Sequence, residues 1–177
     1  SRVEAETSQL FTETAPKSSR VTFTYPAKGT RPPVTVVWRD GALVAPRPAE
    51  WPATDSWPFG DDGGQLWIGD QGKMVAGVYA ENPKLLDAAK MADVTAHPLP
   101  VRYPRLQGVY KEFINAITTN SRAGSDFANH ATGLTEMILH GCLAQRLGSG
   151  IDIEPTTGRI ITSLPEGWVN PPYRSGW

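Results

Sequence analysis

Two acid–histidine pairs at helical spacing are the first residues of this sequence that could do acid–base chemistry. Glu136 precedes His140 by four residues, and Asp93 precedes His97 by the same interval. On a helix, side chains four residues apart share a face, so a carboxylate can orient an imidazole for proton transfer. Pro98 follows His97 and disfavours helical backbone there, so we expect a loop at the second pair rather than a catalytic helix.

The Glu136–His140 pair lies in a stronger helical pattern, Leu134–Leu147, which is apolar on most sides. We expect this helix to be largely buried, the pair to be satisfied within it, and Cys142 to be a buried, unreactive thiol. Contact with a substrate or with a second domain is the alternative role of the pair. A metal site would need His130 as a further ligand, and no other histidine or carboxylate falls at metal spacing, so we predict no metal site.

Two loops hold the residues best suited to contact a small ligand. The segment from Asp40 to Gly64 is long, rich in proline and carries three aromatic residues, which indicates an ordered loop. Asn129 and His130 stand just before the second helix, where polar side chains can point into a cleft, although a cap or a turn is the simpler role. The candidate ligand contacts are Arg39, Asp40, Trp51, Trp57, Asn129 and His130.

Alternating apolar residues predict antiparallel β-structure in the first half of the chain, and two helices in the second. The expected strands cover residues 1–7, 20–25, 34–39, 65–68 and 73–78, the last two joined by a Gly69–Gly72 turn, and the expected helices cover 106–120 and 134–147. The predicted fold class is α+β, an open, mainly antiparallel sheet with helices packed on one face. We expect the other face to meet a partner.

Six tryptophans suggest carbohydrate stacking, which depends on the exposure of their rings. Trp38 and Trp67 lie in predicted strands, so we expect them in the core. The freer tryptophans are Trp51, Trp57, Trp168 and Trp177.

Composition excludes several classes of function. The chain has 177 residues, a net charge of −1 and scattered basic residues, which argues against nucleic-acid binding. No apolar run approaches the roughly 18 residues of a membrane span. The Gly-rich stretch Gly60–Gly64 lacks the G-x-G-x-x-G spacing and carries two carboxylates that would repel a pyrophosphate, so we predict no dinucleotide site. The chain begins within a strand-like pattern without Met, and we expect it to be a fragment.

Five ordered stretches carry more specific motifs: Arg2–Ala5, Trp38–Pro48, Gly69–Lys73, Leu134–Arg146 and Tyr173–Trp177. They resemble the S-V-E-A, W-Y-D-G-G-x-x-P-P-R-P, G-D-K-G-K, L-T-E-M-V-L-L-G-N-x-A-x-R and Y-R-x-G-W segments of one family. That family is Gfo/Idh/MocA (glucose–fructose oxidoreductase, inositol dehydrogenase and rhizopine-catabolism relatives), and the similarity is to its C-terminal domain in the branch common in Planctomycetes- and Bacteroidetes-type bacteria.

The resemblance implies that residues 1–177 are the substrate-binding and oligomerisation domain of an NAD(P)-dependent oxidoreductase acting on a sugar or polyol, with 165–177 as an extended tail. NAD or NADP would be bound by an N-terminal Rossmann domain that this chain lacks. The family's catalytic E-K-P lysine and Asp/His pair would precede Ser1, and Glu81-Asn82-Pro83-Lys84 is not E-K-P. The implied partners are that Rossmann domain, a sugar-like molecule and further copies of the chain, joined through the open sheet face.

Two other functions fit the same residues. One is a free-standing carbohydrate-binding module that uses exposed tryptophans, and the other is a structural dimerisation domain without catalysis. The compartment stays open between the cytoplasm and, if a twin-arginine leader precedes the chain, the periplasm.

Overall fold

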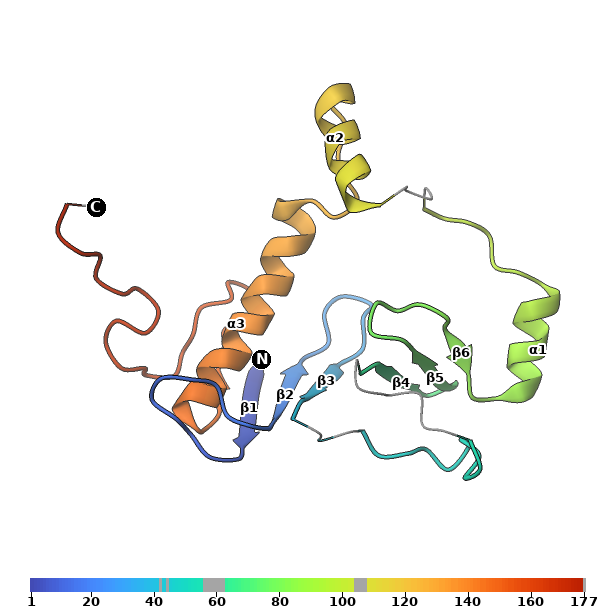
Figure 1. The fold of residues 1–177 in the computed structure, drawn as a ribbon, viewed down its shortest axis with the longest axis horizontal. Coiled ribbons are helices and arrows are strands. Elements are labelled where there is room, and N and C mark those ends of the chain that lie inside the picture. The colour runs from blue at the N-terminus through green and yellow to red at the C-terminus, as the bar shows by residue number, and fades with distance from the viewer. Residues whose placement is uncertain (42, 44, 56–62, 104–107, 177) are drawn as a thin grey trace. The chain divides into compact units, whose positions relative to one another are not determined.

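A computed structural model describes residues 1–41, 43, 45–55, 63–103 and 108–176 of the chain. They form an α+β fold of antiparallel strands and helices with an open sheet, as the sequence predicts (Figure 1). The chain divides into two compact units. The first, which we call the sheet–helix unit, joins Ser1–Leu43 to Gly124–Trp177, and the second, the hairpin unit, is Val44–Ala123. Among the described residues, no helix is long and apolar enough to cross a membrane.

The sheet–helix unit is built on a four-stranded antiparallel sheet. Its strands, in the order β3-β2-β1-β7, are Val34–Arg39, Ser19–Tyr25, Arg2–Thr7 and Ile151–Asp152. The first three lie where the alternation predicts them. The closing strand β7 follows the main helix, so the sheet joins residues from both ends of the chain.

One face of this sheet is covered by a helix. A π-helical turn, η1 (Phe127–Ala131), leads into α3 (Thr132–Leu147), which packs on β1 and β2 (Figure 1). Their side chains bury a single core cluster made of Val3, Val21, Phe23, Ala144, Ile151 and Ile153. Gly141 allows the close approach, because a β-carbon at that position would lie only 2.9 Å from Cζ of Phe23.

The opposite face of the sheet is charged and polar. Strand alternation places Arg2, Glu4, Glu6 and Arg20 on this face, since Val3, Val21 and Phe23 point the other way. Three ion pairs connect its charges: Arg2–Glu4 at 3.1 Å, Arg2–Asp152 at 2.8 Å and Arg20–Glu6 at 3.4 Å. Exposed pairs of this kind contribute little to stability, so the face is one that water can solvate.

The helix α3 is less buried than its sequence predicts. Only Gly141 and Ala144 are buried, while Ile138 and Leu139 are more than half exposed. The expectation that Cys142 is a buried thiol is also wrong, since this residue is exposed. The physical reason is that, within the described part of the sheet–helix unit, one sheet packs against α3 and no second layer of helix or strand covers its other sides.

The hairpin unit holds a smaller sheet and two helices. Its strands β4 (Gln65–Gly69), β5 (Gly72–Ala76) and β6 (Lys84–Leu85) pair antiparallel in that order, and the predicted hairpin between β4 and β5 is confirmed. The predicted helix α2 (Val109–Thr119) ends at Asn120, whose left-handed backbone supplies the expected stop. Within the hairpin unit, no described element packs against α2.

A third helix, α1 (Ala88–Ala96), occupies the segment that we expect to be a loop. Asp87 begins it, because its carboxylate accepts hydrogen bonds from the backbone N–H groups of Ala89 and Lys90. Pro98 has the predicted effect only at the far end, where His97 is the C-cap. The predicted loop is therefore wrong, because a proline constrains the residue before it and leaves the preceding helical turns free to form.

Two tryptophans that we expect in the core are exposed. Trp38 on β3 is 59% exposed and Trp67 on β4 is 56% exposed. Trp38 lies on the edge strand of its sheet, beyond the strands that α3 covers, and Trp67 belongs to a sheet of three short strands. An apolar side chain in a strand is buried only where another layer faces it.

Candidate functional site

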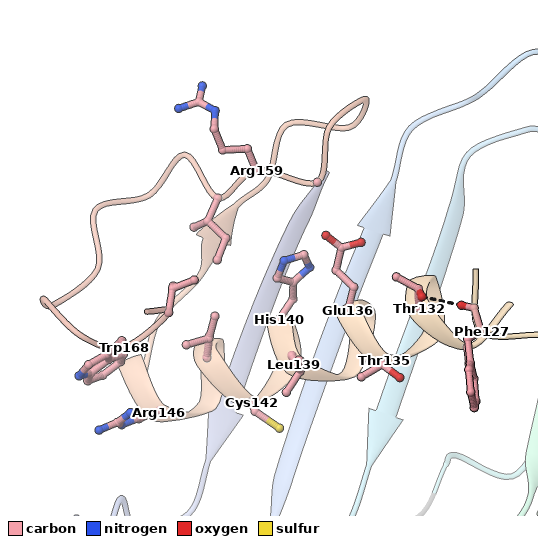
Figure 2. Close-up of a pocket in the computed structure, with 15 residues that line it drawn as sticks. Phe127, Thr132, Thr135, Glu136, Leu139, His140, Cys142, Arg146, Arg159 and Trp168 are labelled. Carbon is pink, nitrogen blue, oxygen red and sulfur yellow. Dashed lines mark hydrogen bonds between the residues drawn. The ribbon is translucent and has the colours of Figure 1, made fainter. Parts of the chain in front are cut away.

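A groove of about 1050 Å³ runs along α3 in the sheet–helix unit (Figure 2). Its walls are α3 with the preceding η1 turn and the segment that follows β7. Most of the lining is apolar, with a few polar and aromatic side chains from both walls. This composition is typical of small-molecule sites, where apolar surface supplies contact and a few polar groups fix orientation. Those groups are Glu136, His140, Arg146, Arg159 and Trp168.

Glu136 and His140 stand one helical turn apart on the side of α3 that faces the turn around Gly158 (Figure 2). The contact is close, since a β-carbon placed on Gly158 would overlap the Glu136 carboxylate. Gly158 also has a φ of +73°, which side chains rarely adopt. Glycine at this position therefore keeps room for the carboxylate at the floor of the groove.

The opposing turn is held rigid by Glu154. Its carboxylate accepts hydrogen bonds from the backbone N–H of Thr156 at 3.1 Å, and from the backbone N–H and the hydroxyl of Thr157 at 2.6 and 2.7 Å. These bonds lower the pKa of Glu154 from 4.5 to about 2. The turn presents Arg159, whose backbone C=O accepts from the N–H of Glu154 at 2.9 Å.

The segment after this turn is fastened to α3 through Trp168. The guanidinium of Arg146, in the last turn of α3, lies over the indole ring at 4.1 Å from its centroid. Such a cation–π contact is worth about 0.5–1 kcal/mol at an exposed site. It places an aromatic ring at one end of the groove, with the Glu136–His140 pair further along the helix (Figure 2).

Partial burial lowers the pKa of His140 below its ordinary value of 6.5, and the nearby Glu136 carboxylate opposes this effect only in part. The imidazole is therefore neutral at pH 7, with one nitrogen that donates and one that accepts. Burial and the same carboxylate raise the pKa of Tyr25 on β2. The groove thus offers a carboxylate acceptor, a guanidinium donor and a neutral imidazole, a set that suits a ligand with several hydroxyl groups.

Asp40, a predicted ligand contact, holds the sheet together. Its carboxylate accepts from the backbone N–H of Ser19 at 2.6 Å, from the Ser19 hydroxyl at 2.9 Å and from Nε1 of Trp38 at 3.3 Å. Ser19 is fully buried, and its Oγ accepts in turn from Nε2 of Gln145 on α3 at 2.6 Å. Arg39 lies beside it on β3, paired in register with Arg20. Neither predicted residue lines the groove.

None of the other predicted contacts that the structure describes is a lining residue of the groove. Trp51 belongs to the hairpin unit, where the ammonium of Lys84 lies 5.1 Å from the centroid of its ring. Trp57 lies outside the described residues. Asn129 donates to the Asp126 carboxylate from its backbone N–H at 2.6 Å and from its side-chain amide at 3.0 and 3.2 Å, which makes it part of the η1 cap.

His130, the last of these contacts, is exposed in η1 and does not line the groove. In the described part of the chain, no three His, Cys, Asp or Glu side chains come together to hold a metal ion. The helical spacing of Glu136 and His140 was the one sequence signal that pointed to the groove. Trp168 was one of the freer tryptophans in the sequence, but neither it nor Arg159 could be placed beside α3, because only the fold brings them there.

No protein-family model and no curated protein matches this chain.

Proposed function

We propose that this chain is the substrate-binding and oligomerisation domain of an NAD(P)-dependent oxidoreductase that acts on a sugar or polyol. The observation that carries the proposal is the α3 groove, where Glu136, His140 and Arg159 surround one space with Trp168 at its end. Vicinal hydroxyl groups each donate and accept hydrogen bonds, which matches a carboxylate, a neutral imidazole and a guanidinium. The indole supplies a surface for the C–H groups of the same ligand.

The cofactor and the proton-transfer residues belong, in this proposal, to a Rossmann domain that precedes the chain. Support comes from the motif stretches similar to the Gfo/Idh/MocA family, and from the absence in the sequence of a G-x-G-x-x-G turn. The open charged face of the four-stranded sheet is the proposed contact between copies. Arg2, Glu6 and Arg20 alternate in sign across it, so a second copy related by a two-fold axis can pair with the same residues.

The proposal is tested by titrating the intact chain with myo-inositol and with glucose, followed by calorimetry and tryptophan fluorescence. Glu136→Gln keeps the shape of the side chain and removes its charge, and we expect it to weaken binding by about tenfold, or about 1.4 kcal/mol. The matched control is Glu13→Gln, because Glu13 is exposed in the same unit and does not line the groove.

Equal affinities of the two variants would contradict the groove assignment. We also expect no oxidation of either compound when NAD or NADP is added to the chain alone. Turnover under those conditions would contradict the assignment of the cofactor to another domain.

A further inference from the structure

The small sheet of the hairpin unit presents an apolar strip with one exposed indole. Trp67 on β4 lies opposite Met74 on β5, and Met74 lies opposite Leu85 on β6, so the three side chains share one face of the small sheet. Trp67 is 56% exposed. Its Nε1 donates to Oε1 of Gln65 at 3.2 Å, which fixes the edge of the indole and leaves a ring face for another molecule.

Polar side chains surround this strip. Trp67, Met74 and Leu85 line a pocket of about 460 Å³, together with Asp70, Gln71, Lys73, Asp87 and Lys90. The size lies in the range of small-molecule sites, about 300–1,000 Å³. The lining combines hydrogen-bond acceptors and donors with the apolar side chains of Trp67, Ile68, Met74 and Leu85. This arrangement suits a ring with apolar faces and hydroxyl groups at its edge.

Several rim groups are held in place by the protein itself. Lys73 donates to both carboxylate oxygens of Glu50, at 2.6 and 2.8 Å, and the ammonium of Lys90 donates to the backbone C=O of Gln71. Asp87 uses one oxygen to cap α1. Asp70, in the turn of the hairpin, forms no hydrogen bond or ion pair with any residue that the structure describes. Its carboxylate is the rim acceptor available to a ligand.

We infer that Trp67 is the stacking platform of a second saccharide site, which binds one pyranose ring of an oligosaccharide. The C–H bonds on one face of a pyranose carry partial positive charge and stack on the negative face of an indole. Asp70 accepts from the hydroxyl groups at the edge of the ring. The core of a protein–protein interface is depleted of charged residues, whereas Asp70, Lys73, Asp87 and Lys90 all line this pocket, which favours a small polar ligand. The inference does not depend on the proposed function, because the site shares no residue with the α3 groove.

The test uses the intact chain with cellohexaose and, separately, mannohexaose as probes, followed by calorimetry and by fluorescence. We expect Trp67→Ala to weaken binding of the preferred probe by about tenfold or more, Trp67→Phe to restore part of it, and Asp70→Asn to weaken it by about threefold. The control Glu13→Gln, at an exposed position that lines neither pocket, should leave the affinity for the oligosaccharide unchanged. The side chain of Trp67 is exposed, so its removal should leave the circular dichroism spectrum intact.

Three results would overturn the inference: neither probe binds at millimolar concentration, Trp67→Ala binds like the natural chain, or Trp67→Ala only changes the oligomeric state seen by light scattering. The last result would show that the hairpin contacts a second copy. The proposed function fails separately, if Glu136→Gln leaves the affinity for myo-inositol and glucose unchanged.

Discussion

The two compact units of this chain differ in how well they bury their apolar side chains. In the sheet–helix unit, strands β1, β2 and β7 and the helix α3 enclose one cluster that includes Val3, Phe23 and Ile151. In the hairpin unit, the described residues bury only Val75 and Ala76 among their hydrophobic side chains. The helix α2 of that unit has no buried residue, although Phe113 and Ile117 lie at helical spacing on it.

The difference shows that an amphipathic pattern creates a core only where a second layer faces it. Burying one large aliphatic or aromatic side chain contributes about 1.5–3 kcal/mol. The sheet–helix unit gathers several such contributions in one cluster, whereas the apolar side chains of α2 remain exposed. We therefore expect the sheet–helix unit to dominate the stability of the isolated chain, and the hairpin unit to open more readily.

The largest expected difference in the free energy of unfolding comes from removing one aromatic side chain from each unit. Phe23→Ala should lower the free energy of unfolding by about 3–5 kcal/mol, because it leaves a cavity under α3. Phe113→Ala should change it by less than about 0.5 kcal/mol, since Phe113 is 59% exposed. Urea unfolding followed by circular dichroism measures both. Equal losses would show that the hairpin unit is as well packed as the other.

A smaller difference in stability is expected between a carboxylate in a hydrogen-bond network, Asp40, and an exposed one, Asp70. Asp40→Ala should lower the free energy of unfolding by about 1–3 kcal/mol, because the buried N–H of Ser19 and the indole N–H of Trp38 lose their acceptor. Asp70→Ala, at the exposed turn of the hairpin, should have an effect close to zero. Thermal unfolding of the two variants measures the difference. A neutral Asp40→Ala would mean that water replaces the carboxylate.

The smallest expected effect is a dependence of stability on pH that comes from His140. Partial burial lowers its pKa in the folded chain, so the unfolded chain binds the proton more readily. The contribution of His140 to the free energy of unfolding is therefore fully present above the pKa of the unfolded chain, about 6.5. It is lost as the pH falls from that value toward the lowered pKa of the folded chain. The melting temperature between about pH 8 and about pH 5 measures it.

His140→Gln should flatten this part of the pH profile. A profile that His140→Gln leaves unchanged would exclude His140 as its source.

The sequence predicts the strands and the hairpin well, because alternation and turn residues act over a few neighbouring positions. It fails for the burial of α3 and of Trp67, since exposure depends on which layers lie above an element. The site is predicted in part. The spacing of Glu136 and His140 indicates one wall of the groove. Arg159 reaches this groove because the chain folds back along β1, where the backbone nitrogen of Ser1 donates to the backbone C=O of Ile153 at 2.9 Å.

The position of β3 at one end of its sheet has a consequence for the protein at high concentration. No described strand pairs with the outer edge of β3. Val34, Val37 and Trp38 of the same strand have exposed side chains. An edge of this kind is a template for another extended chain, which is a common start of aggregation. Pro32 and Pro33 lead into β3 without N–H groups to offer, and the strand is only six residues long. A short strand that follows two prolines offers an incoming chain few backbone hydrogen bonds. This shortage limits edge-to-edge pairing of β3 with another chain.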